Sequence, residues 1–548
     1  MKFTNTLIKG KLIKRYKRFF ADIKVNNSIV TAHCPNTGSM FGLLEKHNEA
    51  WISKADDPKR KLKFTLEMLK VNKNRINVLN DTEPDIKSGE YVLYWVLMYR
   101  RTRYNHALQR AIEWANELEK PLLVFEPLQL KYEWASDRFQ QFIIESMKDS
   151  YDAYSKSKAG YFPFVETAEG ELNGLLESLA SKASVVISDD YPAYFIPQMA
   201  AKGKGIVTCK YEIVDSNGLM PIRSAEKEFV RAHDFRRNMH KNIAEHLEFP
   251  PEENPLTKLK TTFNEDVIKA TLKKWEPTNF TDINIPELVS ELPVDKNVKA
   301  SNITGGSKAA KERMDNFLEN SFNDYSERRS HPSEDIGSGL SPYFHFGNLS
   351  SYEVFKKIVE MEGWSKDKTN EKKVGNRREW WGMSENAEGF LDQLITWREV
   401  GFHTCVYKSN YDQYESLPEW ALETLEEHSK DEREHIYTFE ELENSKTHDE
   451  IWNAAQKQLK EEGIIQNYLR MLWGKKILEW TEHPKTALNY MIQLNNKYAL
   501  DGRDPNSYSG IFWTLGRYDR AWGPERPIFG KIRYMTSDST AKKFNLSG

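Results

Sequence analysis

Four short apolar runs, separated by segments of helical length, constrain the fold of this chain most strongly. They are YVLYWVLM (91–98), PLLVFEPL (121–128), SVVISDD (184–190) and GIVTCKYEIVD (205–215). A strand that is apolar on both faces needs helices over both faces, which is typical of a parallel sheet. Strand–helix–strand order with right-handed crossovers therefore predicts a Rossmann-like parallel α/β domain. We place this domain at residues 76–220.

The other residues of the 548 divide into three parts, in keeping with the three or four domains expected for this length. Residues 1–75 contain short alternating runs broken by NN, PNTGS and DDP, which predicts a small antiparallel β-barrel of the oligonucleotide-binding (OB) type. Residues 221–300 are mixed and Pro-rich, and we expect a connector over the surface. Residues 301–548 have mostly helical patterning, so the fold class is multidomain, α/β plus all-α.

The charge is distributed unevenly along the chain. Residues 1–75 hold 17 Lys and Arg against 6 Asp and Glu, a net charge of +11, whereas the whole chain carries −3 and the remainder therefore −14. A basic block on an acidic body indicates a module that binds a polyanion. A solvated basic face without a ligand has the same composition, and charge alone leaves both interpretations open.

Several classes of protein are excluded. No apolar run approaches the ~20 residues of a membrane helix, and the basic N-terminal segment lacks the apolar core of a secretory signal. Cys34, Cys209 and Cys405 lie far apart and form neither a CxxC motif nor a disulfide framework. We therefore expect reduced thiols in a cytoplasmic protein, with no membrane and no obligate protein partner.

The C-terminal third carries the strongest motifs. The stretch from THDEIWNAAQ to GKIRYM (447–535) resembles the flavin-binding helical domain of class II DNA photolyases. Three further segments resemble the same family in the same order: VLYWVLMYRRTRYNHAL (92–108), NDYSERRSHP to SPYFHFGNLS (323–350) and FLDQLITWRE (390–399). The resemblance covers about residues 90–548 and implies a C-terminal helical domain that binds FAD.

The residues suit such a cofactor. A flavin diphosphate needs backbone N–H groups at a helix N-terminus and short hydroxyl donors, and SGLSP (338–342) supplies them. An ordinary helix cap followed by Pro has the same pattern. By resemblance, Arg470 and Asp501 pair beside the isoalloxazine, where a fixed ion pair would tune the ring. The residues implied to hold FAD are Tyr325, Arg329, Ser338, Gly339, Leu340, Ser341, Arg470, Asp501 and Asp504.

Four catalytic residues follow from the same resemblance. Asn495 matches the position whose amide faces flavin N5, with Asn496 adjacent to it, and an amide can both donate and accept a hydrogen bond. Trp473 and Trp480 are seven residues apart, about two helical turns or roughly 10 Å on one face. With Trp452 they match a tryptophan relay that passes electrons to the flavin. In such a relay the rings lie in near contact and the last ring reaches solvent. The alternative is that these are core tryptophans at helical spacing, which meet neither requirement by necessity.

The substrate positions include one departure from the family. Trp397, Met471 and Trp513 match residues that hold a flipped-out pyrimidine dimer, for which an aromatic and thioether wedge is suited. Four residues before Trp397 the family has a Glu that contacts the dimer, and this chain has Gln393. An amide forms hydrogen bonds but carries no charge, so stabilisation of a dimer radical anion would differ. Asp392 could compensate.

Two further features are less specific. A basic group near the C-terminus could line a DNA phosphate track or simply face solvent. Its members are Arg517, Arg520, Arg526, Lys531 and Arg533. The family's α/β domain often holds a second, antenna chromophore. The matching segments, Tyr104–Asn105 and Ser188–Asp189, name no ligand, and an empty pocket is equally compatible with them.

The N-terminal block resembles a different family. LIKRYKRFFADI (12–23), AHCPNTGSMFGLL (32–44) and DDPKRKLKFTLEML (56–69) are similar to the N-terminal part of sugar fermentation stimulation proteins. The nuclease-like half of that family is missing, so the resemblance implies a DNA-binding module without hydrolytic activity. Aromatic residues interleaved with basic ones are typical of single-strand binders, whereas a strand with core aromatics and a basic edge is the alternative. These residues are Lys14, Arg15, Tyr16, Lys17, Arg18, Phe19 and Phe20.

Together these resemblances imply a light-driven enzyme that repairs pyrimidine dimers in DNA, using photoexcited reduced FAD and no metal. A cryptochrome-like photoreceptor with the same flavin and relay but no repair activity is the main alternative, and Gln393 favours it. A flavin-free scaffold that binds nucleic acid is a third.

Overall fold

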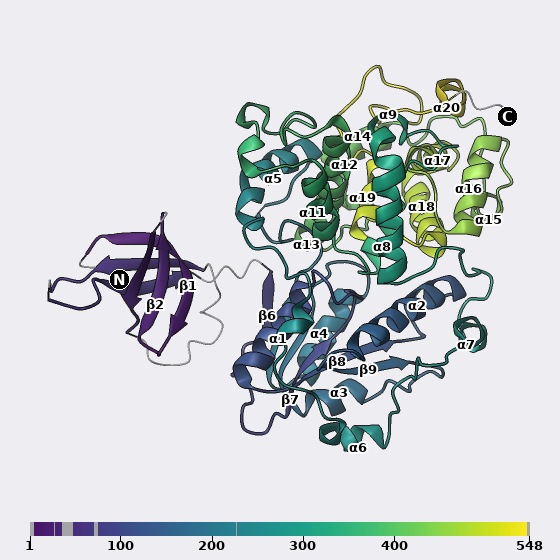
Figure 1. The fold of residues 1–548 in the computed structure, drawn as a ribbon. Coiled ribbons are helices and arrows are strands. Elements are labelled where there is room, and N and C mark those ends of the chain that lie inside the picture. The colour runs from purple at the N-terminus through teal and green to yellow at the C-terminus, as the bar shows by residue number, and fades with distance from the viewer. Residues whose placement is uncertain are drawn as a thin grey trace. The chain divides into compact units, whose positions relative to one another are not determined.

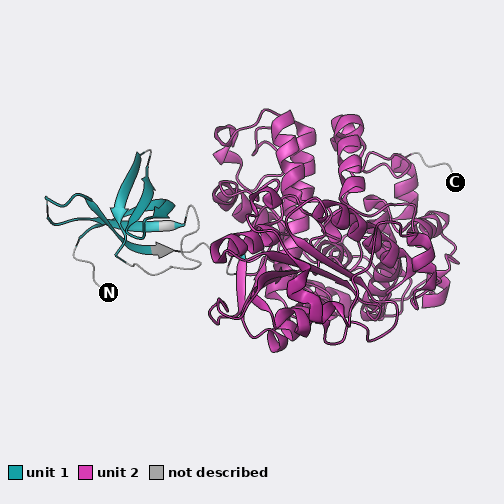
Figure 2. Ribbon diagram, turned by 60° about the horizontal axis from the view of Figure 1, so that its bottom comes forward, with its two compact units in different colours: residues 1–75 teal, residues 76–548 magenta. Residues whose placement is uncertain are grey.

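The computed structural model describes residues 5–26, 28–35, 48–57, 59–70, 75–225 and 227–544. The chain forms two compact units, residues 1–75 and 76–548 (Figure 2). Residues 36–44 of the motif at 32–44 lie outside the described residues.

Unit 1 is a closed five-stranded barrel with the strand order β1-β2-β3-β5-β4. Alternating residues point inward, and the described core includes Leu12, Ile23 and Ile52. The pairing of β3 with β5 is parallel, which the expected antiparallel pattern did not anticipate. The strands are β1 (Leu7–Tyr16), β2 (Phe20–Val25), β3 (Ser28–His33), β4 (Glu49–Lys54) and β5 (Phe64–Lys70).

Unit 2 contains a six-stranded sheet in the order β6-β11-β10-β7-β8-β9. The four predicted strands are present and pair in parallel, flanked by helices (Figure 1). The sequence prediction missed both edge strands: β6 is antiparallel, and β9 (GYFPFV) contains Pro163, a residue that disfavours a strand assignment. The strands are β6 (Ile76–Asn80), β7 (Tyr91–Trp95), β8 (Leu122–Leu128), β9 (Gly160–Val165), β10 (Ala183–Asp189) and β11 (Lys210–Val214).

The apolar run 91–98 leaves the sheet after β7 for an electrostatic reason. The backbone N–H groups of Leu97, Met98 and Tyr99 all donate to the buried Asp189 carboxylate, at 2.7–2.9 Å. The helices around the sheet are α1 (His106–Leu118), α2 (Asp137–Tyr154), α3 (Leu175–Ala180) and α4 (Ile196–Ile206).

Residues 221–300 include a helix that belongs to the helical half of unit 2. In α5 (Ala232–His246), Met239 and Ile243 are part of the same core cluster as α12 residues such as Phe390. Beyond α5 the segment has short helices only, α6 (Lys269–Leu272) and α7 (Ile285–Glu291).

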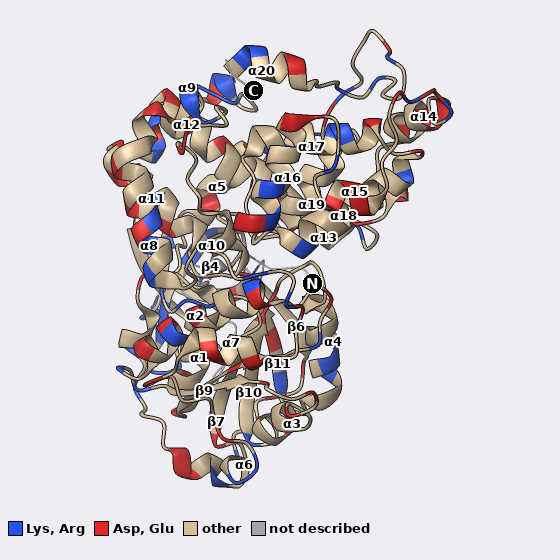
Figure 3. Ribbon diagram, turned by 90° about the vertical axis from the view of Figure 1, so that its right-hand side faces the viewer, with Lys and Arg blue, Asp and Glu red and all other residues tan. Residues whose placement is uncertain are grey.

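The helical half surrounds one large core that also includes side chains of α2. Acidic residues gather on α14 and α15 (Figure 3). Among the described residues, no helix combines the length and hydropathy needed to cross a membrane. The helices are α8 (Ser307–Asn316), α9 (Tyr325–Arg328), α10 (Ser341–His345), α11 (Ser351–Met361), α12 (Glu385–Leu391), the π-helical turn η7 (Asp392–Trp397), α13 (Arg398–Tyr407), α14 (Glu419–Glu427), α15 (Phe439–Glu443), α16 (Glu450–Glu462), α17 (Asn467–Glu479), α18 (Pro484–Tyr498), α19 (Pro505–Trp513) and α20 (Ser537–Phe544).

Candidate functional site

A cavity in the helical half brings together residues from distant segments. Its empty space, with the open solvent at its mouth included, is about 570 Å³. Five predicted cofactor residues line it together with the predicted substrate residue Gln393. The lining residues are Tyr325, Ser338, Ser341, Phe344, Phe390, Gln393, Leu394, Arg398, Asp501, Asp504 and Asn506.

One side of the cavity is held by aromatic packing. The buried ring of Tyr325 packs edge-on against Phe390, with centroids 5.2 Å apart, and the Arg329 guanidinium lies over the Tyr325 ring at 5.4 Å. The carbonyl of Arg329 accepts a hydrogen bond from Gln466 Nε2 at 2.8 Å, which ties this segment to the start of α17. Arg329 therefore stands beside the cavity through its contact with Tyr325.

The serine-rich turn contributes two side chains and a constrained backbone. Ser338 and Ser341 line the cavity, whereas the Leu340 side chain is buried in the core and could meet a ligand only through its backbone. Gly339 has a φ of +65°, and an added Cβ would lie 2.5 Å from Arg313 Nε, so only glycine fits without displacing Arg313. Arg313 Nε in turn donates to the Ser338 carbonyl at 2.8 Å.

Asp501 and Arg470 form a bidentate ion pair at the cavity wall. Arg470 Nη2 lies 2.9 Å from Asp501 Oδ1, and Nη1 lies 3.2 Å from Oδ2. Burial by itself raises the pKa of Asp501, but the charge of Arg470, with hydrogen bonds from Arg470 and Ser341, outweighs it and leaves the pKa lowered. Asp501 is therefore an anion, and Arg470 Nε, buried and without a protein partner among the described residues, retains a free donor.

Asp504 has a structural role as well as a place in the cavity lining. It caps α19 by accepting from Asn506 N at 2.8 Å, and it accepts the Tyr191 hydroxyl at 2.9 Å. His345 Nδ1 lies 3.5 Å from the same carboxylate oxygen, but burial lowers the His345 pKa and favours the neutral ring. Asp504 thereby links the helical half to the end of the sheet.

The two candidate amides are both buried and hydrogen-bonded within the fold. Asn496 is occupied on both sides: it accepts from Arg503 N at 2.9 Å and donates to the Tyr508 hydroxyl at 3.1 Å. Asn495 donates to Ser507 Oγ at 2.7 Å, next to the cavity-lining Asn506. Asn495 Nδ2 also donates to Asn496 Oδ1 at 3.3 Å, so the amide nitrogens of both residues have partners within the fold.

The three tryptophans form a connected, buried group. Trp452, Trp473 and Trp480 are 0%, 2% and 2% exposed. The rings of Trp452 and Trp480 meet edge-on with centroids 5.6 Å apart, and the Trp452 indole N–H donates to the Trp473 carbonyl at 3.0 Å. Trp473 lies one helical turn after Arg470 on α17, so the group begins beside the cavity wall. None of the three rings ends at solvent, which the relay was expected to do.

The four predicted substrate residues share an unusual exposure. Gln393, Trp397, Met471 and Trp513 are half-buried. The residues that flank them on η7 and α19 are almost all buried, whereas those before Met471 on α17 are half-buried or exposed. Because these four side chains are partly exposed, they are available to contact a ligand. Asp392, the suggested compensating acid, instead forms a buried bidentate pair with Arg236 at 2.6 and 3.0 Å. It therefore cannot stand in for a carboxylate at position 393.

One residue of the predicted basic group, Arg517, is buried and not at the surface. Arg517 is 4% exposed, donates to the Tyr411 carbonyl at 2.9 Å and to Ser416, and stacks on Phe512 at 3.8 Å, so it supports the fold and does not face DNA. The other members are at least partly exposed: Arg520, Arg526, Lys531 and Arg533.

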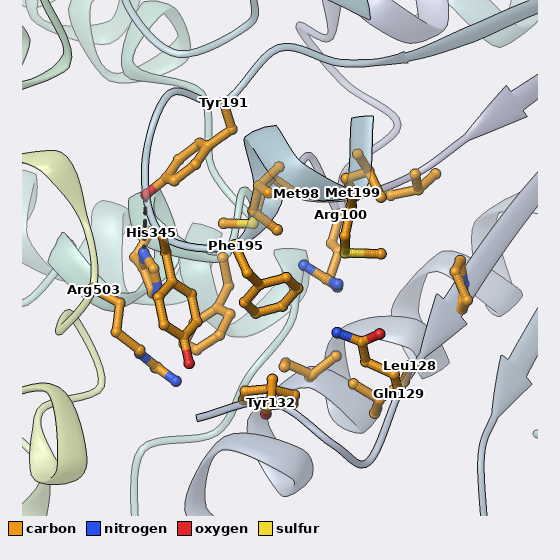
Figure 4. Close-up of a pocket in the computed structure, with 17 residues that line it drawn as sticks. Met98, Arg100, Leu128, Gln129, Tyr132, Tyr191, Phe195, Met199, His345 and Arg503 are labelled. Atoms are coloured by element: carbon orange, nitrogen blue, oxygen red, sulfur yellow. Dashed lines mark hydrogen bonds between the residues drawn. The ribbon is translucent and has the colours of Figure 1, made fainter. Parts of the chain in front are cut away.

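A second cavity, with an empty space of about 610 Å³ that includes open solvent, lies between the sheet and the helical half (Figure 4). Tyr132, Tyr194, Phe195 and Phe346 supply aromatic surface, and Arg503 Nη2 is buried there without a hydrogen-bond partner among the described residues. None of the four suggested antenna residues lines it. Asn105 caps α1, Ser188 donates to Trp95 O, Asp189 binds backbone N–H groups and Tyr104 packs against Tyr352.

Comparison with known proteins covers both units. The deoxyribodipyrimidine photo-lyase of Methanothermobacter thermautotrophicus is 32% identical over 478 residues, spanning 87% of this chain and 97% of the relative. The chain belongs to the DNA photolyase family. A second photolyase relative, from Arabidopsis thaliana, is 29% identical over 471 residues, 83% of this chain and 87% of the relative.

The fold and the N-terminal unit are also matched. A class III photolyase from Agrobacterium tumefaciens shares the fold with a TM-score of 0.58 and 15% identity, covering 83% of this chain and 84% of that one. A Synechocystis cryptochrome has a TM-score of 0.56 at 12% identity, covering 83% and 86%. The family model for the SfsA N-terminal OB domain matches residues 13–78. A sugar fermentation stimulation protein homolog of Pelagibacter ubique is 47% identical over 123 residues, 20% of this chain and 53% of the relative.

Photolyases and cryptochromes bind FAD, and the first cavity fits that cofactor. Two serine hydroxyls and the unpartnered Arg470 Nε are donors suited to phosphate or a ring carbonyl, and Asp501 is an ionised acceptor beside them. Tyr325 and Phe390 add flat apolar surface. The donor set and the aromatic surface thus agree with a flavin nucleotide.

Sequence reasoning missed five lining residues of this cavity. Phe390 lies three residues before Gln393 and four before Leu394, so helical spacing leads from Gln393 to Phe390 and from Phe390 to Leu394. Arg398 follows Trp397 in the WRE motif, and its Nη1 donates to Asn217 O at 2.8 Å. Phe344 and Asn506 lie within the quoted segments 323–350 and 447–535, but their residue types did not single them out.

Proposed function

We propose that this protein repairs pyrimidine dimers in DNA by light-driven electron transfer from fully reduced FAD. The observation that carries the proposal is the first cavity, where the cofactor residues Tyr325 and Asp501 and the substrate residue Gln393 line one space. A flavin held by Tyr325 and Asp501 would therefore meet a base held by Gln393 without an intervening layer of protein.

FAD, when bound, supplies the light absorption and the electron that splits the dimer. The chain's own residues supply binding and electrostatics. Ser338 and Ser341 offer hydroxyl donors, and the Arg470–Asp501 pair presents a fixed dipole that needs no reorganisation during the reaction. Asn495 would hold a hydrogen bond at the flavin edge, positioned by Ser507.

The substrate side would accept a nucleotide extruded from the duplex. Trp397 and Trp513 offer aromatic faces and Met471 a thioether at the protein surface. Extrusion costs a few kcal/mol, and less for a lesion that is already poorly paired, which contributes to selectivity. Gln393 would donate from its amide to a dimer carbonyl without contributing charge.

The test is illumination of the reduced, FAD-loaded protein with an oligonucleotide that contains a single defined lesion. We expect blue light to restore the bases of the cyclobutane dimer, and the dark sample to show no change. A 6-4 photoproduct in a parallel sample identifies the lesion class. Persistence of both lesions while the flavin responds to light would refute repair.

A second candidate function is light reception without repair, and Gln393 is the observation that favours it. Because Asp392 is paired with Arg236, no carboxylate replaces the missing acid on η7. Gln393→Glu separates the two functions: if the wild-type protein fails to repair and the Glu variant repairs, this chain is a photoreceptor built on a repair scaffold. If both repair, the amide suffices for the enzyme.

We also propose that unit 1 adds affinity for DNA. Phe19 is 47% and Tyr16 is 37% exposed at the β1–β2 hairpin, and neither they nor Phe20 belong to the barrel's core cluster. Lys17 and Arg18 occupy the turn between them with left-handed backbones, and both are exposed. Exposed aromatic rings beside cations suit stacking on unpaired bases along a phosphate chain.

The second cavity is our candidate for an antenna chromophore. Its aromatic walls suit a flat ring, and the free Nη2 of Arg503 suits an acidic group on that ring. Absorbance of the purified protein, before and after denaturation releases the bound chromophores, tests this assignment. Arg503→Gln should lower the content of a second chromophore while the FAD content stays unchanged.

A further inference from the structure

A long loop joins α11 to α12 in the helical half. It covers residues 362–384, all of them described, and holds only two short 3₁₀ turns, η5 (Lys366–Lys368) and η6 (Glu371–Lys373). Loops longer than about 12–15 residues are uncommon in compact domains, and they are usually either functional or disordered. The contacts of this loop decide between the two.

The loop is held in place by buried partners. The Trp380 ring stacks on the His240 ring of α5 with centroids 3.8 Å apart and planes 5° from parallel, and Gly375 N donates to His240 Nδ1 at 3.0 Å. Burial lowers the pKa of His240 to about 3, so the ring stays neutral and Nδ1 stays an acceptor. The buried Glu388 of α12 accepts from Gly382 N at 2.9 Å. The loop is therefore anchored on α5 and on α12, and a function is the expected reason for its length.

These contacts fix the position of Arg377. Two residues before it, Gly375 is bound to α5. Directly after it, Arg378 forms an ion pair with Glu385 at the start of α12 and donates to Ser326 Oγ of α9 at 3.4 Å. Arg377 therefore lies where the loop crosses from α5 to α9.

Both of these helices contact the segment that leads into η7, where two of the predicted substrate residues lie. On α5, Arg236 pairs with Asp392, the first residue of η7. On α9, the Tyr325 ring packs against Phe390 of α12, two residues before η7 begins. Arg377 therefore stands beside the substrate side of the first cavity.

The guanidinium of Arg377 lacks a counter-ion among the described residues. Its side chain reaches solvent, and no hydrogen bond or ion pair joins it to another residue in the described part of the chain. Partial burial lowers the pKa of Arg377, and so does the repulsion of three guanidinium groups, those of Arg236, Arg533 and Arg329. Asp392 acts in the opposite direction, but it is already paired with Arg236. Convergent like charges without an anion are unfavourable, and the planar fork of an arginine fits a phosphate with two hydrogen bonds.

We propose that Arg377 binds a backbone phosphate of the nucleotide that is extruded toward η7. This inference rests on the proposed repair function. An undamaged base pair stays stacked in the duplex, so its phosphate is not brought to Arg377, whereas a poorly paired lesion is extruded at lower cost. A phosphate contact carries no sequence information, but this one forms only with the extruded nucleotide. Arg377 thereby helps the protein to distinguish damaged from undamaged DNA.

The experiment measures DNA binding in the dark by the FAD-loaded full chain. Two duplexes of one sequence, with and without a single cyclobutane dimer, are compared over a range of salt concentrations. In the wild type we expect the slope of log K against log salt to be steeper by about one for the damaged duplex. Arg377→Gln should abolish this difference and weaken binding to the damaged duplex about tenfold at low salt. Binding to the undamaged duplex should stay the same.

The diphosphate of FAD is the other candidate phosphate, and the flavin content separates the two sources. Arg377→Gln should leave the flavin-to-protein ratio and the melting temperature unchanged, because the Arg377 side chain reaches solvent and has no partner in the described part of the chain. A lower flavin ratio together with an unaltered difference between the salt slopes would assign Arg377 to the cofactor and overturn the inference.

Two further variants serve as controls. Arg378→Gln removes an adjacent charge that Glu385 already neutralises, so the difference between the slopes should remain. Arg377→Lys keeps the charge but not the fork, so the difference should remain while the affinity for the damaged duplex falls. Equal slopes for the two duplexes in the wild type overturn this inference and leave light-driven repair standing. A wild type without any preference for the damaged duplex overturns both the inference and the proposed substrate site.

Discussion

Arg470 binds both carboxylate oxygens of Asp501 through its two terminal nitrogens, at 3.2 and 2.9 Å. The two residues are 31 positions apart, on α17 and on the loop before α19, and their side chains are only 18% and 12% exposed. The pair therefore joins two parts of the cavity wall and fixes the charge that a bound flavin would meet.

Breaking this pair should cost both stability and cofactor. Asp501→Asn leaves Arg470 largely buried without a counter-ion, for which about 3–5 kcal/mol is typical when one partner of a buried pair is removed. We expect a lower melting temperature and a lower flavin-to-protein ratio. Glu415→Gln is the control, since the Lys485–Glu415 pair is 71% and 56% exposed and should contribute less than about 1 kcal/mol. Equal shifts in the two variants would contradict the prediction.

Replacing relay tryptophans should slow flavin photoreduction without removing the flavin. Trp473→Phe and Trp452→Phe keep an apolar ring but remove an oxidisable indole, so steady-state photoreduction should fall by an order of magnitude or more. The control is Trp364→Phe, because Trp364 packs against Phe355 and Trp381 in a separate cluster. Absorbance during illumination with an added reductant measures the rate. A normal rate in both relay variants would rule out this path.

Stability should rise with pH through a buried lysine. Burial lowers the pKa of Lys475 from its ordinary 10.5 to about 7, while its Nζ donates to Thr514 O at 2.6 Å. Between these values the unfolded chain binds the extra proton, so the free energy of unfolding increases with pH from about 7 to about 10.5, by up to a few kcal/mol.

The variant Lys475→Met removes this dependence. We expect its melting temperature to change less between pH 7 and pH 10 than that of the wild type, even if its absolute value is lower because the Thr514 hydrogen bond is gone. Lys485→Met, at an exposed lysine, should leave the wild-type pH slope unchanged. Parallel pH curves for the wild type and Lys475→Met would show that Lys475 titrates normally.

The β1–β2 hairpin of unit 1 should determine part of the salt dependence of DNA binding. Replacing Lys17 and Arg18 by Gln should weaken binding and reduce the slope of log K against log salt by about one to two, if each contacts a phosphate. Phe19→Ala should weaken binding to single strands by about 1–3 kcal/mol with little change in slope. Lys204→Gln, an exposed residue of α4, is the control. Unchanged slopes would exclude the hairpin as the contact.

Local patterns in the sequence sufficed for much of the architecture. The apolar runs predicted the four inner strands of the sheet, and alternation in residues 1–75 predicted the barrel. Both signals arise from the pattern of buried side chains along a single strand. The edge strands β6 and β9 escaped prediction since an edge strand has fewer buried residues and a weaker signal. The parallel β3–β5 pair depends on a contact between distant strands, which no local pattern reports.

The residue types of the site came from motifs, and their relationships came from tertiary contacts. Spacing on a helix placed Trp473 and Trp480 on one face, and local order placed Ser338 and Ser341 together. Only the folded chain shows three contacts. Arg236 pairs with Asp392, Asn496 accepts a hydrogen bond from a backbone N–H, and the Tyr437 ring packs against Trp480. These contacts join residues between 7 and 156 positions apart in the sequence. Local periodicity specifies which residues are buried, whereas the partner of a buried group is decided by how the elements pack.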